Sequence, residues 1–313
     1  MSRTLTTSFL FSLLAICAGV VVRPQSSLPQ VSARFADEVR RLAAEGLRLK
    51  ETLEASLDGQ SNHLAAIFER AKPKSPSEAN EFRIIEGNGQ AATTIFRRTE
   101  FFFSFPSAES TTLNATDLNG DGLKEVIVQS SSGGNCWSCN PTEIYRVKNH
   151  KAELIAAGPI SRIADLDGDG RAELVVADSR WEVYGDLSHA AAPLAFMIYA
   201  WRSGRYVYAS RDFPDFYKSE IERLRGEVDR TRAAITGEDS SDDPYIGRAV
   251  SLAITIAQLG DAERAAAELR SSLTSNVHST AQRKRRAAII EDFTSGDSAK
   301  KLREIKHGDP LPF

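Results

Sequence analysis

Two short acidic segments carry the residue types most suited to chemistry in this chain. Each places side-chain oxygens at its first, third, fifth and ninth positions and a glycine at its sixth, and each leads into a valine-rich stretch. The segments are Asp117-Leu118-Asn119-Gly120-Asp121-Gly122-Leu123-Lys124-Glu125 and Asp165-Leu166-Asp167-Gly168-Asp169-Gly170-Arg171-Ala172-Glu173. Carboxylates this close repel one another unless a cation lies among them, and ligand sets made only of oxygen favour a hard ion, usually Ca²⁺. The sixth-position glycine lets the chain turn sharply around that ion.

An EF-hand loop opens with the same pattern, but it ends in a bidentate glutamate at position twelve and is flanked by helices. Position twelve here is Val128 in the first segment and Val176 in the second. The residues that follow the ninth position form short apolar runs rich in valine, which are typical of buried strands. The sequence therefore excludes an EF-hand. An acidic β-turn held by side-chain hydrogen bonds, without metal, is the alternative to a calcium loop.

The two segments resemble the FG-GAP/VCBS repeats of integrin-α-like β-propellers, in which a loop of this form joins strands within a blade and holds Ca²⁺. The resemblance covers about residues 100–210. It implies two structural calcium sites whose side-chain ligands are Asp117, Asn119, Asp121 and Glu125, and Asp165, Asp167, Asp169 and Glu173. The main-chain carbonyls of Leu123 and Arg171, at position seven, complete the expected sets. The ninth residue is Glu in both copies, where Asp is common in the family.

Composition sets limits on the other possibilities. The chain of 313 residues is 42% hydrophobic, which supports several packed modules, and its net charge of −3 gives no nucleic-acid footprint. The one basic cluster, Arg283-Lys284-Arg285-Arg286, has no interleaved aromatic residues and is typical of a solvated helix face. We therefore expect no nucleic-acid partner.

The N-terminus has the pattern of a secretory signal peptide over residues 1–22. Arg3 precedes the apolar stretch from Phe9 to Val22, which is shorter than the roughly 20 residues of a spanning helix. We expect a secreted or periplasmic protein whose mature chain has no membrane span. Leu14-Ala15-Ile16-Cys17 resembles a lipobox, although Ile16 stands where a small residue is expected, so a lipoprotein anchored at Cys17 is the alternative.

Cys136 and Cys139 are the pair left beyond the signal segment. In an oxidising compartment such a pair predicts a disulfide that staples a loop. A redox C-x-x-C motif would need a helix N-terminus to lower the pKa of the first thiol, and glycine-rich loop surrounds it here. Zinc would need two more ligands, for which only the scattered His150 and His189 are available.

The remaining sequence predicts helical segments on both sides of a β module. An apolar period over residues 30–72 predicts helices, in which His63 is a lone surface residue, and the prolines of residues 73–81 predict a linker. The β module spans residues 82–212, with period-two strands. Residues 215–313 are predicted to be helical, and a helical hairpin at 248–273 resembles a single tetratricopeptide unit, with a frayed helix and coil from Ala299. The strands expected next to the two segments include 125–129, 143–147, 173–177, 180–184, 196–201 and 205–209.

These elements predict an α+β fold, in which antiparallel blades of FG-GAP type form a partial propeller flanked by N-terminal and C-terminal helical segments. The second acidic segment begins 48 residues after the first, a blade-like period. Two blades are recognisable, or three if a degenerate blade precedes Leu113, and a closed propeller needs at least about four. The helices or a second chain must then cover the exposed blade edges, which predicts a monomer or an edge-paired dimer.

The sequence favours an exported non-catalytic module in which Ca²⁺ is structural and which binds a protein or glycan partner or acts in envelope assembly. No recognisable nucleophile, zinc, nucleotide or dinucleotide motif is present, and the five histidines lie far apart. The alternative is a calcium-dependent hydrolase or lyase, or a thiol oxidoreductase that uses Cys136 and Cys139.

Overall fold

The computed structural model describes residues 30–89, 91–106, 115–237 and 241–312. The expected signal peptide over residues 1–22 and the alternative lipid anchor at Cys17 lie outside the described residues. Among the described residues, no helix combines the length and the apolar composition that crossing a bilayer requires.

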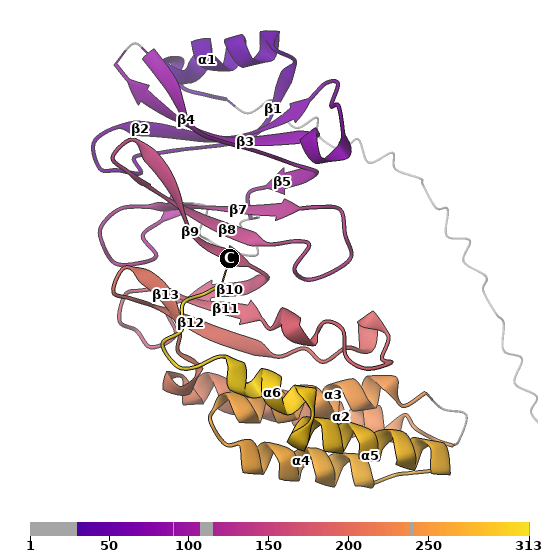
Figure 1. The fold of residues 1–313 in the computed structure, drawn as a ribbon. Helices are drawn as coiled ribbons and strands as arrows, with labels where there is room; N and C mark the ends of the chain where they lie inside the picture. The colour runs from indigo at the N-terminus through magenta and orange to yellow at the C-terminus, as the bar shows by residue number, and fades with distance from the viewer. Residues whose placement is uncertain (1–29, 90, 107–114, 238–240, 313) are drawn as a thin grey trace, which may run out of the picture.

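Three antiparallel sheets stack in chain order (Figure 1). The first sheet is a meander of β1 (Leu47–Ala55), β2 (Asn62–Arg70), β3 (Asn80–Asn88) and β4 (Ala91–Glu100). The middle sheet has the order β5 (Phe102–Ser104), β7 (Glu125–Ser131), β8 (Thr142–Lys148) and β9 (Lys151–Gly158), with β6 (Ala115–Thr116) also paired to β7. The third sheet is a meander of β10 (Ile160–Ala164), β11 (Glu173–Ala177), β12 (Phe196–Arg202) and β13 (Arg205–Tyr208).

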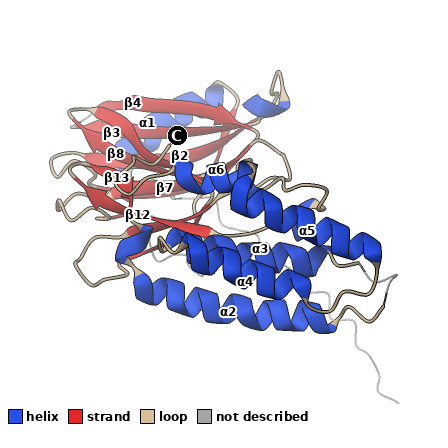
Figure 2. Cartoon of the chain, turned by 60° about the horizontal axis from the view of Figure 1, so that its bottom comes forward, coloured by secondary structure: helices blue, strands red, loops and turns tan. Residues whose placement is uncertain are grey.

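Helices cover the two outer faces of this stack. Helix α1 (Ala33–Ala44) lies on the first sheet, and five helices follow the third sheet (Figure 1). Those five are α2 (Pro214–Ala233), α3 (Asp243–Gln258), α4 (Ala262–Thr274), α5 (Thr280–Ser295) and α6 (Asp297–Glu304). Figure 2 shows these helices as a layer beside the strands. After α6 the chain returns to the third sheet, where Pro310 pairs with Val207 of β13. Single 3₁₀ turns lie at Pro76–Glu78, Ser179–Trp181, His189–Ala191 and Ser210–Asp212.

Burial on both faces explains the valine-rich runs. In β7, Val126 and Val128 pack toward the first sheet, while Ile127 packs toward the third. A strand covered on both sides loses its polar positions, because every side chain then enters a core. The outer cores are similar: Phe35 of α1 packs on the first sheet, and Tyr217 of α2 packs on the third.

The strands expected next to the acidic segments are confirmed except at 180–184, and the helices that carry the hairpin at 248–273 are confirmed as well. The fold is mixed α and β with three antiparallel sheets that are not closed into a ring. The helices contact outer sheet faces, so the expectation that they cover blade edges was wrong. A face offers a wide apolar surface to a helix, whereas an edge offers a row of backbone groups.

The helical prediction for residues 30–72 was wrong beyond α1. Gly46, at φ +85°, ends that helix, and residues 47–55 and 62–70 form β1 and β2. The leucines of β1 fit a helical and an alternating pattern equally well, and β2 is an apolar run buried on both faces. Residues 73–81 join two neighbouring strands of one sheet rather than two domains, and His63 is fully buried.

Two further expectations changed. Residues 180–184 do not form a strand, because Asp178 accepts hydrogen bonds from the Arg180 N–H and from Trp181 Nε1 and holds a 3₁₀ turn there. The predicted frayed tail from Ala299 is instead α6 followed by a segment bound to the third sheet.

Candidate metal centres

Each acidic segment forms a tight loop between a short first strand and a buried second strand. The first loop joins β6 to β7 and the second joins β10 to β11. In the first, the Asp117 carboxylate accepts hydrogen bonds from the N–H groups of Gly120, Asp121 and Gly122 at 2.8, 3.2 and 2.8 Å. The second repeats this arrangement around Asp165, whose carboxylate accepts from Gly168, Asp169 and Gly170 at 2.7, 3.2 and 3.0 Å.

The same turn requires left-handed backbone at two glycines in each loop. Gly120 and Gly122 have φ values of +74° and +85°, and Gly168 and Gly170 have +80° and +84°. Side chains rarely adopt this conformation, so the glycine pattern specifies the loop shape. The seventh residues, Leu123 and Arg171, donate their N–H groups to Asp121 and Asp169 at 2.9 and 2.8 Å.

The ninth residue of each loop is a buried glutamate. Glu125 is 0% exposed and Glu173 is 2% exposed, and they accept from the N–H groups of Leu118 and Leu166 at 2.9 and 2.8 Å. Burial raises the pKa of each glutamate to about 7, and the neighbouring aspartates add charge repulsion. A bound cation would reverse this effect, because it favours the ionised carboxylates.

The loops differ at their third position. In the first, Asn119 Nδ2 donates to Glu125 Oε1 at 2.6 Å, so an amide relieves part of the negative charge. In the second, Asp167 has no proton to donate when ionised. Ligand oxygens of Asp165, Asp167 and Glu173 lie within 4.8 Å of one another. The second loop therefore carries the greater uncompensated charge and fits a divalent cation with oxygen ligands better.

The two loops are in direct contact. Ala172 N–H donates to Leu118 O at 2.8 Å, and the side chain of Arg171 lies against Gly120. Tyr206 of β13 is buried beside them, and its hydroxyl has no hydrogen-bond partner among the described residues. Burial raises the pKa of Tyr206, and the charges of Glu125 and Glu173 add to this rise. The loops therefore form one paired centre.

Cys136 and Cys139 are bonded in the structure, with Cα atoms 4.9 Å apart, which is compatible with the expected disulfide. Glu182 holds this loop by accepting from Trp137 N–H and from Ser138 Oγ, the latter at 3.2 Å. The residues after Cys136 form turns rather than a helix, so the loop lacks the helix N-terminus that activates redox C-x-x-C motifs.

The basic cluster does not form an open patch. Arg286 is 1% exposed and bonds to Asp242 at 2.9 Å, and Arg285 pairs with Asp186 and Asp243. Two of the four basic side chains are therefore engaged in ion pairs within the protein.

The structure also brings together Asp58, His63 and Glu86, which the sequence analysis did not connect. His63 and Glu86 are directly opposite each other on β2 and β3. Their meeting depends on strand register, and no sequence spacing signals it.

No model of a known protein family matches the chain, and no curated protein matches it either.

Proposed function

We propose that the protein is an exported, non-catalytic calcium-binding module of FG-GAP-type blades. Two structural Ca²⁺ ions stiffen the stacked sheets, which present a surface to a protein or glycan partner or act in envelope assembly. The observation that carries this proposal is the paired centre, in which two glutamates are buried beside aspartates and form no ion pair with any cationic side chain among the described residues.

The burial of the carboxylates supports a structural role over a catalytic one. Glu125 and Glu173 are inaccessible to a substrate, and the aspartates are engaged by loop N–H groups. Ca²⁺ in these loops would supply charge neutralisation and fix the connection between paired strands. The chain's own residues supply the oxygen ligands and the glycine turns.

Calorimetric titration of the mature protein tests the calcium sites. We expect about two Ca²⁺ per chain in the extracellular range of roughly 10⁻⁴ to 10⁻³ M. At tenfold excess over Kd, each site adds about 1.4 kcal/mol of stability. Asp169→Ala should lose more calcium-dependent stability than Asn119→Ala, because the second loop has the greater charge. An absence of calcium heat, together with equal melting temperatures in calcium and in chelator, would refute the proposal.

The partner is tested by capture from envelope extract with and without chelator. If calcium acts only through the fold, Glu173→Gln should weaken calcium affinity, and saturating calcium should restore any partner capture that is lost. An enzymatic activity abolished by Glu173→Gln in saturating calcium, with the melting temperature unchanged, would instead assign that loop to catalysis.

A further inference from the structure

The loop between β1 and β2 shares two hydrogen bonds with the two acidic loops. Leu118 and Leu166 donate their N–H groups to the buried Glu125 and Glu173. Leu57 donates in the same way to Nδ1 of His63, at 3.4 Å, and His63 likewise begins the buried part of the second strand of its sheet.

The next residue of each loop repeats the correspondence. Asn119 and Asp167 accept from the N–H two residues ahead, at 2.9 and 3.1 Å, and each is followed by glycine. Asp58 accepts from Gln60 N–H at 2.9 Å and is followed by Gly59. The β1–β2 loop therefore shares these two hydrogen bonds with the acidic loops, with a histidine in place of the buried glutamate. It does not share their first-position carboxylate, because Ser56 precedes Leu57.

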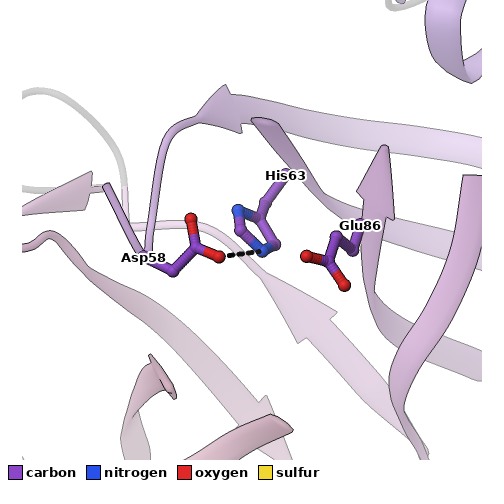
Figure 3. A group of neighbouring side chains, drawn as sticks. All are labelled: Asp58, His63 and Glu86. Carbon is purple, nitrogen blue, oxygen red and sulfur yellow. Dashed lines mark ion pairs between the residues drawn. The ribbon is translucent and has the colours of Figure 1, made fainter. Parts of the chain in front are cut away.

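This replacement changes the ligand chemistry. His63 is 0% exposed, and its Nε2 has no hydrogen-bond partner among the described residues. Figure 3 shows Nε2 between two carboxylates, with Asp58 Oδ2 at 4.0 Å on one side and Glu86 on the other. A ligand atom from each of the three residues lies within 4.8 Å of the other two. A buried nitrogen that faces two carboxylates and makes no hydrogen bond is a candidate metal ligand.

A second imidazole lies behind this group, as a partner of Glu86. His150, in the turn between β8 and β9, is 66% exposed and places Nδ1 2.8 Å from Glu86 Oε1. It comes from the middle sheet, whereas the other three residues belong to the first. His150 is not part of the group whose ligand atoms all lie within 4.8 Å of one another, so it supports the site by holding Glu86 from the neighbouring sheet.

We propose that Asp58, His63 and Glu86 form a binding site for a divalent transition metal of the Zn²⁺ class, with His150 positioning Glu86. One imidazole and two carboxylates suit zinc with water as the fourth ligand, whereas Ca²⁺ prefers oxygen ligands alone. Zn–ligand bonds of about 2.0–2.1 Å in a tetrahedron place ligand atoms about 3.4 Å apart, so atoms that lie up to 4.8 Å apart close by up to about 1.4 Å on binding. Asp58 lies in a loop, a position that permits that movement.

Metal binding at Nε2 also requires a change in the tautomer of His63. A neutral imidazole ring carries a single proton, on one of its two nitrogens. Because Nδ1 accepts from Leu57, that proton is on Nε2 in the metal-free protein. The metal takes the Nε2 lone pair, the proton moves to Nδ1, and the long contact with Leu57 opens. The ring remains neutral throughout.

The test is calorimetric titration of the mature chain, without a histidine tag and in saturating Ca²⁺, with Zn²⁺ as the probe. We expect one Zn²⁺ per chain. His150→Ala should weaken binding by about tenfold or more, the loss that even a residue behind the ligands can cause. The matched control is His189→Ala, because His189 also pairs with a glutamate, Glu182 at 3.4 Å, but belongs to no such cluster. Equal affinities for the wild type and His150→Ala, or no stoichiometric Zn²⁺ binding, would overturn the proposal.

His63 itself is buried, and its substitution tests folding as well as binding. Its tautomer can instead be followed in the wild-type chain by nitrogen NMR. Zn²⁺ should move the ring proton from Nε2 to Nδ1, and an unchanged His63 signal at saturating Zn²⁺ would rule out this ligand. Glu173→Gln should leave Zn²⁺ binding unchanged, so the zinc proposal and the calcium proposal can be refuted independently.

Discussion

Replacing Glu173 with glutamine should stabilise the protein without calcium and reduce the stabilisation that calcium gives. In the calcium-free protein, the Glu173 side chain is buried and its pKa is raised from 4.5 to about 7. Glutamine keeps an oxygen for the Leu166 N–H but carries no charge near Asp165 and Asp167. It therefore removes an unfavourable ionisation.

The magnitude follows from the pKa difference between the folded and unfolded chains. The folded protein holds the Glu173 proton up to about pH 7, and the unfolded chain releases it near pH 4.5. The extra stability of the protonated form is thus fully present below about pH 4.5 and is lost as pH rises through 7. At 1.36 kcal/mol per pKa unit, the cost above pH 7 is about 3 kcal/mol, and at pH 5 it is about 1 kcal/mol.

Urea unfolding followed by circular dichroism measures this difference in chelator and in calcium. In chelator, Glu173→Gln should be more stable than the wild type by about 3 kcal/mol at pH 8, and by about 1 kcal/mol at pH 5. Calcium should reduce the difference in unfolding free energy between the variant and the wild type at pH 8. At 100 times Kd, calcium binding stabilises the wild type by about 2.7 kcal/mol and the variant by less. The control Glu222→Gln, at an exposed position on α2, should neither stabilise the calcium-free protein nor change the stabilisation that calcium gives. A variant less stable than wild type in chelator at pH 8, or a difference that calcium leaves unchanged, would refute the reasoning.

Three further predictions concern the rest of the fold. Gly247→Ala places a Cβ 1.8 Å from a carbonyl oxygen and should lower the free energy of unfolding by about 3 kcal/mol, measured by urea unfolding. In the same assay the control Gly226→Ala, whose Cβ meets no atom within 4 Å, should raise the free energy of unfolding by about 0.5–1 kcal/mol. Arg286→Met should cost about 2 kcal/mol in the same assay, because a buried charged hydrogen bond to Asp242 is lost while Arg285 stays paired with that carboxylate; no loss of stability would contradict this. Thiol titration of the native exported protein should find the 136–139 cysteine pair oxidised, and replacing both by serine should lower the melting temperature only modestly, because the loop that the bond closes is short. Reduced thiols would contradict that last expectation.

The sequence predicted the elements whose pattern has one physical interpretation. β7 and β11 were predictable because an apolar run too short for a helix follows each acidic loop. The hairpin of α3 and α4 was predictable from alanine-rich helical spacing around Gly260. β1 and β2 were not predictable in this way, because the leucines of β1 fit both periods and β2 is buried on both faces. Only packing between sheets decided their conformation.

The same distinction applies to the candidate sites. The oxygen-bearing side chains of each acidic loop lie within nine consecutive residues, so their spacing alone predicted that they come together. Tyr206 approaches that centre from β13, and Glu86 reaches His63 across a strand pair. Residues brought together by sheet register leave no spacing signal, and His63 was for that reason interpreted as a surface residue.

The contacts among the loops suggest how an open stack of sheets keeps its register. Leu123, in the first acidic loop, packs against Gly59 of the β1–β2 loop, and Leu118 O accepts from Ala172 N–H of the second acidic loop. Each sheet is thus joined to the next by its loop as well as by the core between them. A cation that fixes one loop also fixes the surface against which the neighbouring loop packs. An ion bound in the loop of the middle sheet should therefore restrain the loops of the first and third sheets as well.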